Sequence, residues 1–296
     1  MRVSVLLLTF NEAANLPTVL AQLISFDDIV AVDSGSTDDT LDLLARHGVR
    51  VLNRPFDDFA RQRNFGLDEG ALRHEWVLHL DADEVLTPDF ITALEALAPS
   101  EELDAYYVPS KTIFFGRWLK HAGMYPSYQA RLGHRDRLRF VQVGHGQRED
   151  LPTERVGVFP EPYLHYSFSH GLVPWLDKHV RYAAAEAIEI AHTKERERKD
   201  AGGRTAGRRR LKRLANLLPL PLRPVMRFVY VYLWRRGFLD GRAGLRYAVM
   251  LAVYEGMIAV AAFERIGRGK TPGGSLRPQP PLQASSRAVL PPTQRR

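Results

Sequence analysis

Two aspartates follow a hydrophobic run in the first third of the chain. Asp81 and Asp83 come directly after residues 76–80, Trp-Val-Leu-His-Leu, a pattern typical of a buried strand. Side chains two residues apart on an extended chain point to the same side, so this strand presents two carboxylates together. Adjacent carboxylates repel unless a cation or a hydrogen-bond donor separates them. The pair predicts a site for Mg²⁺ or Mn²⁺, shared with a diphosphate.

Two polar groups upstream suit the same ligand. Asp33 follows the apolar run 29–32 and can accept a hydrogen bond from a base N–H or a ribose hydroxyl. Residues 61–64, Arg-Gln-Arg-Asn, place a guanidinium and an amide at the start of a predicted helix, where a phosphate or base edge would meet them. Alone, Asp33 is equally well a turn cap and Arg63 a surface cation. Together with the aspartate pair they favour a nucleotide-sugar site.

Alternating strands and helices must position these groups. Apolar patterns predict strands at 3–8, 29–32, 49–52 and 75–80, and helices at 13–24, 38–46 and 58–70. This alternation indicates an α/β fold with a mostly parallel sheet flanked by helices. Ligands of such sheets bind beyond the carboxyl ends of the strands, so we expect residues 9–11, 33–36 and 81–83 to share one rim.

The middle of the chain mixes shorter elements. Strands are predicted near 105–109, 129–133, 138–143 and 162–167, followed by a helix over 172–193. The 296 residues include no cysteine, which excludes disulfides, thiolate zinc sites and cysteine nucleophiles. The N-terminus lacks the small-residue cleavage site of a signal peptide.

The positive charge is concentrated in one segment. Residues 192–213 contain ten Lys or Arg against three acids, and so carry the whole net charge of +7. This segment is either a solvated loop or a patch for an anionic membrane surface. No aromatic residues interleave the basic ones, so we expect no nucleic-acid partner.

An apolar stretch follows the basic one. Residues 247–263 are apolar except for Glu255 and Gly256, which is short of the roughly 20 uncharged residues of a spanning helix. We expect a helix that lies in or dips into a membrane, or packs on its neighbour at 225–236; a buried soluble hairpin is the alternative. Residues 269–296 have the composition of a disordered tail.

Other nucleotide-binding families fit less well. A Rossmann dehydrogenase needs a glycine-rich first turn, whereas residues 9–15 contain no glycine. A nucleotidyltransferase would also need a glycine-rich phosphate loop, and no Walker A sequence occurs. A noncatalytic nucleotide-sugar-binding or membrane scaffold protein with the same fold stays open.

Four motifs in order carry a resemblance to a known family. They are residues 8–12 (Leu-Thr-Phe-Asn-Glu), 32–40 (Val-Asp-Ser-Gly-Ser-Thr-Asp-Asp-Thr), 62–64 (Gln-Arg-Asn) and 80–84 (Leu-Asp-Ala-Asp-Glu). The chain resembles the family 2 glycosyltransferases of GT-A fold, and more narrowly the bacterial branch with lipopolysaccharide-core glucosyltransferases. The resemblance is specific over residues 1–110 and looser through 125–132, 164–166 and 237–241.

The resemblance implies roles for the motif residues. Asp83 would bind the metal directly, with Asp81 beside it, and transfer would be inverting. The donor would be a UDP-sugar, and the acceptor a lipid-linked glycan such as lipopolysaccharide core. The residues implied to surround the nucleotide are Thr9, Asn11, Glu12, Asp33 and Arg63.

The catalytic base is the least determined residue. The related branch often has a Val-His-Glu triplet, but residues 143–150 read Val-Gly-His-Gly-Gln-Arg-Glu-Asp. Glu149 is the first candidate for the base that deprotonates the acceptor, Asp150 the second and His145 the third. We expect His165 to be a further metal or phosphate contact, and Glu84 to be a further contact to acceptor or sugar.

These expectations divide the chain into five parts. The enzyme would be peripheral, at the cytoplasmic face of a bacterial inner membrane. The parts are a nucleotide-sugar-binding half (1–110), an acceptor-side half (111–193), a basic linker (194–213), an apolar helical region (214–268) and a disordered tail (269–296).

Overall fold

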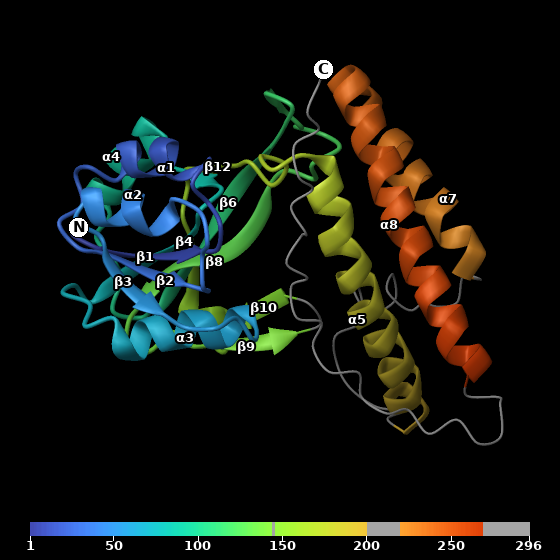
Figure 1. Cartoon of the computed structure of the whole chain (residues 1–296), viewed down its shortest axis with the longest axis horizontal. Coiled ribbons are helices and arrows are strands. Elements are labelled where there is room, and N and C mark those ends of the chain that lie inside the picture. Colours follow the sequence, from blue (N-terminus) through green and yellow to red (C-terminus); the bar gives the residue numbers. More distant parts are fainter. Residues whose placement is uncertain (144–145, 200–219, 269–296) are drawn as a thin grey trace, which may run out of the picture.

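The protein has an α/β lobe and a lobe of long helices. The computed structural model describes residues 1–143, 146–199 and 220–268. His145, residues 200–213 of the predicted basic linker and the predicted tail at 269–296 lie outside the described residues. Figure 1 shows the sheet and its covering helices on one side, and α5, α7 and α8 on the other.

One ten-stranded sheet organises the α/β lobe. Along its main path the order is β3-β2-β1-β4-β8-β6-β12-β5, with β7 and β11 both paired to β6. The first four strands are parallel, as expected. Beyond β4 the sheet is mixed, because β8 runs antiparallel to both β4 and β6. The strands are β1 (Ser4–Thr9), β2 (Ile29–Asp33), β3 (Arg50–Asn53), β4 (Trp76–Asp81), β5 (Glu84–Val85), β6 (Ala105–Phe114), β7 (Arg117–Trp118), β8 (Ser127–His134), β9 (Phe140–Val143), β10 (Gly146–Glu149), β11 (Val156–Val158) and β12 (Tyr163–His165).

Two hydrophobic cores lie on the two faces of this sheet. Alternate residues of β1 point into opposite cores: Val5 and Leu7 into one, Leu6 into the other. Helices α1, α2 and α4 cover the first face, and α3 with the β9–β10 hairpin covers the second (Figure 1). The strands are buried on both faces, which is why they read as continuous apolar runs. The helices of this lobe are α1 (Leu16–Gln22), α2 (Thr40–Arg46), α3 (Phe59–Glu69) and α4 (Pro88–Ala96), with a 3₁₀ turn at Thr153–Arg155.

The predicted elements of the first 81 residues are confirmed within a few residues at each end. The pattern did not predict α4. The residue before this helix, Thr87, caps it by accepting a hydrogen bond from the Phe90 N–H at 3.2 Å. Strand β6 continues across the boundary predicted at residue 110. The two predicted halves therefore share one continuous sheet.

The second lobe is a helical hairpin packed on α5. After a 3₁₀ turn at Leu220–Leu222, α7 (Arg223–Val229) continues through a π-helical turn at Tyr230–Trp234 and a 3₁₀ corner at Gly237–Asp240 into α8 (Gly241–Arg268). Helix α8 packs on both α7 and α5 (Leu172–Lys199). At the corner, a Cβ on Gly244 would lie 2.0 Å from the Gly237 carbonyl oxygen. Glycine at 244 therefore permits the close approach of the chain at this corner.

The corner is tied to the α/β lobe. The Asp240 carboxylate is buried and accepts from the backbone N–H groups of His121 and Ala122, at 3.0 and 2.7 Å. Tyr247 of α8 also contacts Phe114 and Phe168, edge to face. The apolar helices therefore share packing with the sheet lobe.

Much of the α7–α8 surface stays apolar and exposed. Among the described residues, one helix, Gly237–Glu264, is long and apolar enough to cross a membrane, with a mean hydropathy of 1.5. It packs on the neighbour predicted at 225–236, but only 22% of its most apolar window is buried. A fully buried hairpin is therefore not what the structure shows.

Candidate functional site

The ends of β1 and β2 are joined by the Asp33 carboxylate. Asp33 is fully buried and accepts hydrogen bonds from the N–H groups of Gly35 and Ser36, at 2.9 and 2.8 Å. Its other oxygen accepts from the hydroxyls of Thr9 and Ser36. Four donors thus occupy Asp33, so the structure shows it shaping the loop. Its direct contact with a base or ribose stays a prediction.

Asn11 and Glu12 continue this loop-to-loop contact. Asn11 adopts a left-handed backbone with φ of 54°, which asparagine tolerates better than most residues, and its side chain accepts from the Thr37 N–H at 2.7 Å. The Glu12 carboxylate lies 3.0 Å from His170 Nε2 and 2.6 Å from Asn15 Nδ2. Burial raises the pKa of Glu12 above its ordinary value, and this effect outweighs the hydrogen bonds with Asn15 and His170, which lower it. Both residues lie at the predicted rim, only partly buried.

Asp81 is held between two arginines. Its Oδ1 accepts from Arg63 and its Oδ2 from Arg131, each at 2.6 Å. Burial raises the pKa of Asp81, but the two guanidinium groups outweigh burial and hold it well below its ordinary value. The Asp81 side chain is still 29% exposed, so one edge faces the rim.

Arg63 does not lie where the sequence suggested. It was expected at the surface of a helix start, meeting a phosphate or base, but it is fully buried. Its partner is Asp81 from a neighbouring element, because α3 packs over the sheet face that carries Asp81. Arg63 therefore holds the Asp81 carboxylate in place, and its direct contact with nucleotide stays a prediction.

Glu84, expected to touch the acceptor or sugar, is also fully buried. It accepts from Arg131 at 2.5 Å and from the Asp81 N–H at 3.0 Å. Burial raises the pKa of Glu84. Arg131 is the residue that the sequence analysis missed, and its only signal was a charge inside the predicted strand 129–133. This arginine holds Asp81 and Glu84 in one buried cluster.

Asp83 meets His165 beside this cluster. Strand β5 pairs antiparallel with β12 so that His165 lies opposite Glu84, and His165 Nε2 is 3.4 Å from Asp83 Oδ2. Burial raises the pKa of Asp83, but His165 outweighs it and holds that pKa below its ordinary value. Burial alone would lower the pKa of His165, yet Asp83 raises it to about 9. Both side chains remain about a quarter exposed.

This pair suits a divalent cation bound together with a ligand. The carboxylate suits Mg²⁺ or Mn²⁺, and the His165 imidazole could join a Mn²⁺ shell once the cation displaces the proton that Asp83 stabilises. In the part of the chain that the structure describes, no group of three or more His, Asp or Glu side chains can hold a metal ion. Asp83 and His165 therefore supply two ligands at most, and diphosphate oxygens and water would complete the shell. The other predicted ligand, Asp81, forms ion pairs with its two arginines, and its contact with a metal stays a prediction.

Glu149 and Asp150, two of the three candidate bases, lie on and beside the β9–β10 hairpin. Glu149 accepts a hydrogen bond from the Tyr107 hydroxyl at 2.5 Å. Burial and Glu149 together raise the pKa of Tyr107 to about 12, so the phenol keeps its proton. Asp150 is exposed, with its N–H donating to the Arg139 carbonyl. No hydrogen bond or ion pair within the described ranges joins Glu149 to Asp81 or Asp83, and its catalytic role stays a prediction.

Comparisons with known proteins extend this description. An uncharacterised glycosyltransferase of Rickettsia felis is 30% identical over 106 residues, 36% of this chain and 37% of that protein. The lipopolysaccharide core biosynthesis glycosyltransferase LpsC of Rhizobium meliloti is 28% identical over 164 residues, 53% of this chain and 57% of that protein. The chain thus spans between about a third and somewhat over half of the lengths of these curated relatives.

Solved structures show a looser likeness. TarS of S. aureus in complex with UDP has 16% identity and a TM-score of 0.40, covering 94% of this chain and 95% of its own. Glucosyl-3-phosphoglycerate synthase from Mycobacterium tuberculosis, in complex with Mn²⁺, UDP and glucosyl-3-phosphoglycerate, has 18% identity and a TM-score of 0.39, covering 56% of this chain and 72% of its own.

The sequence profile of one family matches the part of the chain that builds the rim. It covers residues 4–146, which include the Asp33 loop, the arginine pair around Asp81, and Asp83. Over these residues the lobe has the GT-A arrangement of a mixed sheet with helices on both faces. Residues 4–146, just under half of the chain, therefore match the family described as Glycosyl transferase family 2.

Proposed function

We propose that this glycosyltransferase moves a sugar, with inversion, from a UDP-sugar to a lipid-linked glycan of the cell envelope, with Mg²⁺ or Mn²⁺. One observation carries the proposal: Asp83 and His165 lie 3.4 Å apart, partly exposed, beside the fixed carboxylate of Asp81. The motif resemblance supports the UDP-sugar donor. The family relationship to LpsC supports a lipopolysaccharide-core acceptor.

The residues divide the work of binding and transfer. Asp83 and His165 would hold the cation, which supplies countercharge to the leaving diphosphate. Arg63 and Arg131 fix the Asp81 carboxylate beside that site. The Asp33 loop, with Thr9, Asn11 and Glu12 around it, would form the nucleotide side of the rim. Glu149 would take the proton of the acceptor hydroxyl as it attacks the anomeric carbon.

Donor binding tests the enzyme against a noncatalytic scaffold. The melting temperature of the full chain is measured with UDP and a panel of nucleotide sugars, with Mn²⁺ or with chelator. A ligand at 100 times its dissociation constant adds about 2.7 kcal/mol to the free energy of unfolding, so the correct donor should raise the melting temperature. Because the cation is proposed to hold the diphosphate, this rise is expected only when metal is present. Release of UDP in the presence of membrane lipid extract distinguishes turnover from binding alone.

Replacement of the proposed base gives a sharper test. Glu149→Gln is expected to lower kcat by about a hundredfold or more, the lower scale of general-base catalysis. Donor binding, followed by thermal shift with Mn²⁺, should be unchanged because the base acts on the acceptor. Tyr107→Phe is the matched control, since it removes the 2.5 Å hydrogen bond to Glu149 but keeps the carboxylate. A normal rate for Glu149→Gln with an inactive Asp150→Asn would transfer the role to Asp150.

We also propose that the α7–α8 face holds the enzyme on an anionic bilayer, at the cytoplasmic face of the inner membrane. Val225, Phe228, Val249 and Val253 line part of an apolar groove of about 450 Å³ between the two helices. Exposed side chains continue this surface, and Trp234 is 81% exposed. Burial of such side chains in lipid is favourable by roughly 25 cal/mol per Å², and it does not weaken with salt.

Removal of α7 and α8 would also remove contacts that Tyr247 and Tyr254 of α8 make with aromatic side chains of the rest of the protein. Point variants therefore test the membrane attachment better than a truncation does. The double variant Val225→Asp/Val253→Asp is expected to reduce vesicle binding in high salt by at least about tenfold. Val158→Asp, an exposed valine of the α/β lobe, is the control and should bind normally. Cosedimentation with anionic vesicles measures both, and equal binding by all three proteins would contradict the proposal.

A further inference from the structure

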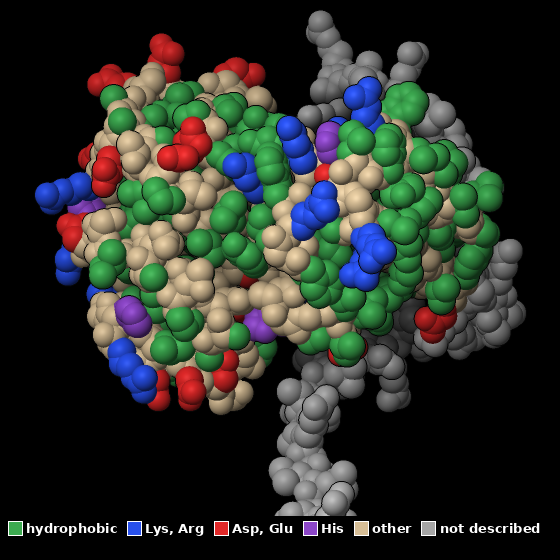
Figure 2. Space-filling view, turned by 90° about the horizontal axis from the view of Figure 1, so that it is seen from above, with side chains coloured by type: hydrophobic (Ala, Val, Ile, Leu, Met, Phe, Trp, Pro, Cys, Tyr) green, Lys and Arg blue, Asp and Glu red, His purple; other side chains and the backbone are tan. Residues whose placement is uncertain are grey.

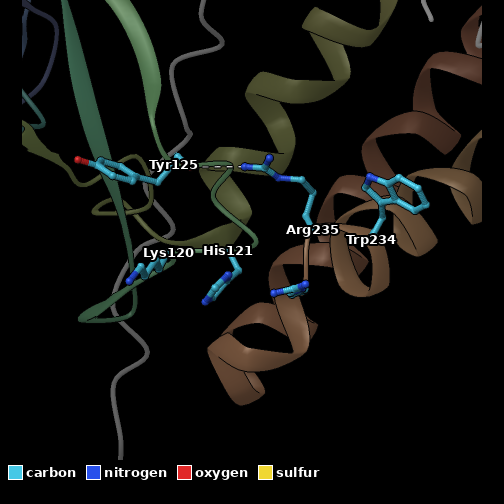
Figure 3. A pocket seen from close by; sticks show the side chains of 6 residues that line it. Lys120, His121, Tyr125, Trp234 and Arg235 are labelled. Atoms are coloured by element: carbon cyan, nitrogen blue, oxygen red, sulfur yellow. Dashed lines mark hydrogen bonds between the residues drawn. The ribbon is translucent and has the colours of Figure 1, made fainter.

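A cationic pocket lies where the two lobes meet. It has a volume of about 330 Å³ and combines a loop of the α/β lobe with the corner before α8. Figure 3 shows Arg235 reaching from the corner toward Tyr125 of that loop, with Trp234 on its other side in this view. The pocket is lined by Lys120, His121, Tyr125, Trp234, Arg235 and Arg236.

The walls of this pocket are fixed by contacts between the lobes. Asp240 holds the loop by accepting from the N–H groups of His121 and Ala122. On the same corner, Arg235 donates to the Tyr125 carbonyl at 3.5 Å. Arg236 adopts a left-handed backbone with φ of 58°, which costs free energy for a residue with a side chain. The cations are therefore placed by the fold rather than carried on a free segment.

These cations lack a countercharge. Within the described residues, neither Lys120 nor Arg235 nor Arg236 forms an ion pair with a carboxylate. The one acid nearby, Asp240, is committed to two backbone N–H groups. The Nε of Arg235 is buried without any acceptor in the described structure, and a buried donor without a partner is costly. A bound anion would supply the missing countercharge.

The chemistry favours phosphate over a carboxylate group. Two guanidinium groups and an ammonium offer many N–H donors around one small volume, which matches the three or four oxygens of a phosphate. Phosphomonoesters also carry more charge near neutral pH than a carboxylate does.

The pocket opens beside the apolar face of the helical lobe. Trp234 and Leu233 precede the cations in sequence, and Phe238 and Leu239 follow them, all exposed. Figure 2 shows hydrophobic side chains over the helical lobe, with Lys and Arg side chains near its junction with the α/β lobe. Tryptophan and cationic side chains together are typical of the headgroup level of a membrane. The pocket therefore suits an anion carried at a lipid surface.

The pocket is also close to the proposed reaction site. His165 of β12 pairs with Thr112 of β6, and the Thr112 carbonyl accepts from the N–H of Leu119, the residue before Lys120. Neighbouring strands lie about 4.8 Å apart, so two spacings separate the His165 backbone from this loop by roughly 10 Å. The backbone distance between the two places is therefore within the length of a sugar-phosphate headgroup.

We propose that this pocket binds a phosphate group on the headgroup of the lipid-linked acceptor, so that the acceptor is a phosphorylated glycolipid. Its role as acceptor site rests on the proposed function, whereas the phosphate binding rests on the pocket alone. The phosphate positions the acceptor at the membrane surface, with its glycan extending toward Asp83 and His165.

Vesicle binding by the full chain tests the pocket. The probes are phosphatidylcholine vesicles that contain phosphatidic acid, or a sulfolipid at equal surface charge. Wild type is expected to bind the phosphatidic acid vesicles at least about tenfold more tightly, and Lys120→Gln/Arg236→Gln should lose this preference. Both positions are exposed, so the fold should persist. Arg242→Gln/Arg246→Gln removes the same charge from exposed positions of α8 outside the pocket and should keep the preference.

Three outcomes would overturn the inference. The first is no headgroup preference in wild type, and the second is equal loss in the pocket and control variants, which would indicate diffuse electrostatics. The third is binding of soluble pyrophosphate as tight as that of the vesicles, which would assign the pocket to a free phosphate. Binding of UDP with Mn²⁺ is measured on the same proteins. If wild type does not bind UDP with Mn²⁺, the proposed function is wrong, whereas the phosphate binding shown by the vesicles would still hold.

Discussion

Asp83→Asn is expected to abolish sugar transfer while the protein stays folded. The amide is a poor ligand for a hard cation, and Asp83 is one of the two side chains that, among the described residues, we propose to hold the metal. Loss of the metal removes several kcal/mol of charge stabilisation from the leaving diphosphate, which corresponds to a fall in kcat of about a thousandfold or more. The measurement is UDP release at saturating donor and Mn²⁺.

The controls separate a metal ligand from a structural acid. Asp89→Asn, an exposed aspartate of α4, should turn over normally. Asp83→Asn should also lose the Mn²⁺-dependent thermal shift by UDP, and chelator should reduce wild type to the level of the variant. Normal turnover of Asp83→Asn, or full activity of wild type in chelator, would show that the metal assignment is wrong.

The first half of the fold was predictable because its signals are local. Parallel strands buried on both faces give continuous apolar runs, and the alternation of such runs with short helices fixes the direction of the strands. The polar residues that follow β1, β2 and β4 had to share one rim. Register bears this out, since Thr9 pairs with Asp33 and Leu8 with Asp81.

The contacts that define the site were not predictable, because they join distant residues. Arg63 reads as a surface cation until α3 is packed over Asp81. Arg131 and Asp81 are fifty positions apart in sequence, and their pairing depends on an antiparallel strand inserted beside a parallel set. His165 reaches Asp83 only through the β5–β12 pairing. Periodicity carries no information on such pairs.

The same limit applies to the join between the lobes. The sequence marks residues 237–241 as a break in an apolar stretch, and the structure shows why: the corner needs glycine at 237 and 241, and Asp240 caps a loop 118 positions earlier. Apolar composition predicted α8 but not which of its faces is covered. Packing on α5 and α7 determines that the remaining face is exposed.

Arg131→Met is expected to be the most destabilising of these substitutions, by about 3–5 kcal/mol, the cost of breaking a buried ion pair by removing one partner. Arg131 is 2% exposed, and its removal leaves Asp81 with one arginine and Glu84 with none. At roughly 2–4 °C per kcal/mol for a chain of this size class, the melting temperature should fall by about 10 °C. Thermal unfolding without ligand measures this.

Two further substitutions test whether the unpaired buried charge causes the loss of stability in Arg131→Met. Arg137→Met removes a half-exposed partner of Asp104, for which about 1 kcal/mol or less is expected. Adding Glu84→Gln to Arg131→Met should recover part of the lost stability, because the neutral amide no longer leaves a buried charge unpaired. If the double variant loses as much stability as Arg131→Met and Glu84→Gln lose in sum, the unpaired buried charge is not the cause. A melting temperature of Arg131→Met within 2 °C of wild type would show that Asp81 and Glu84 do not depend on this arginine.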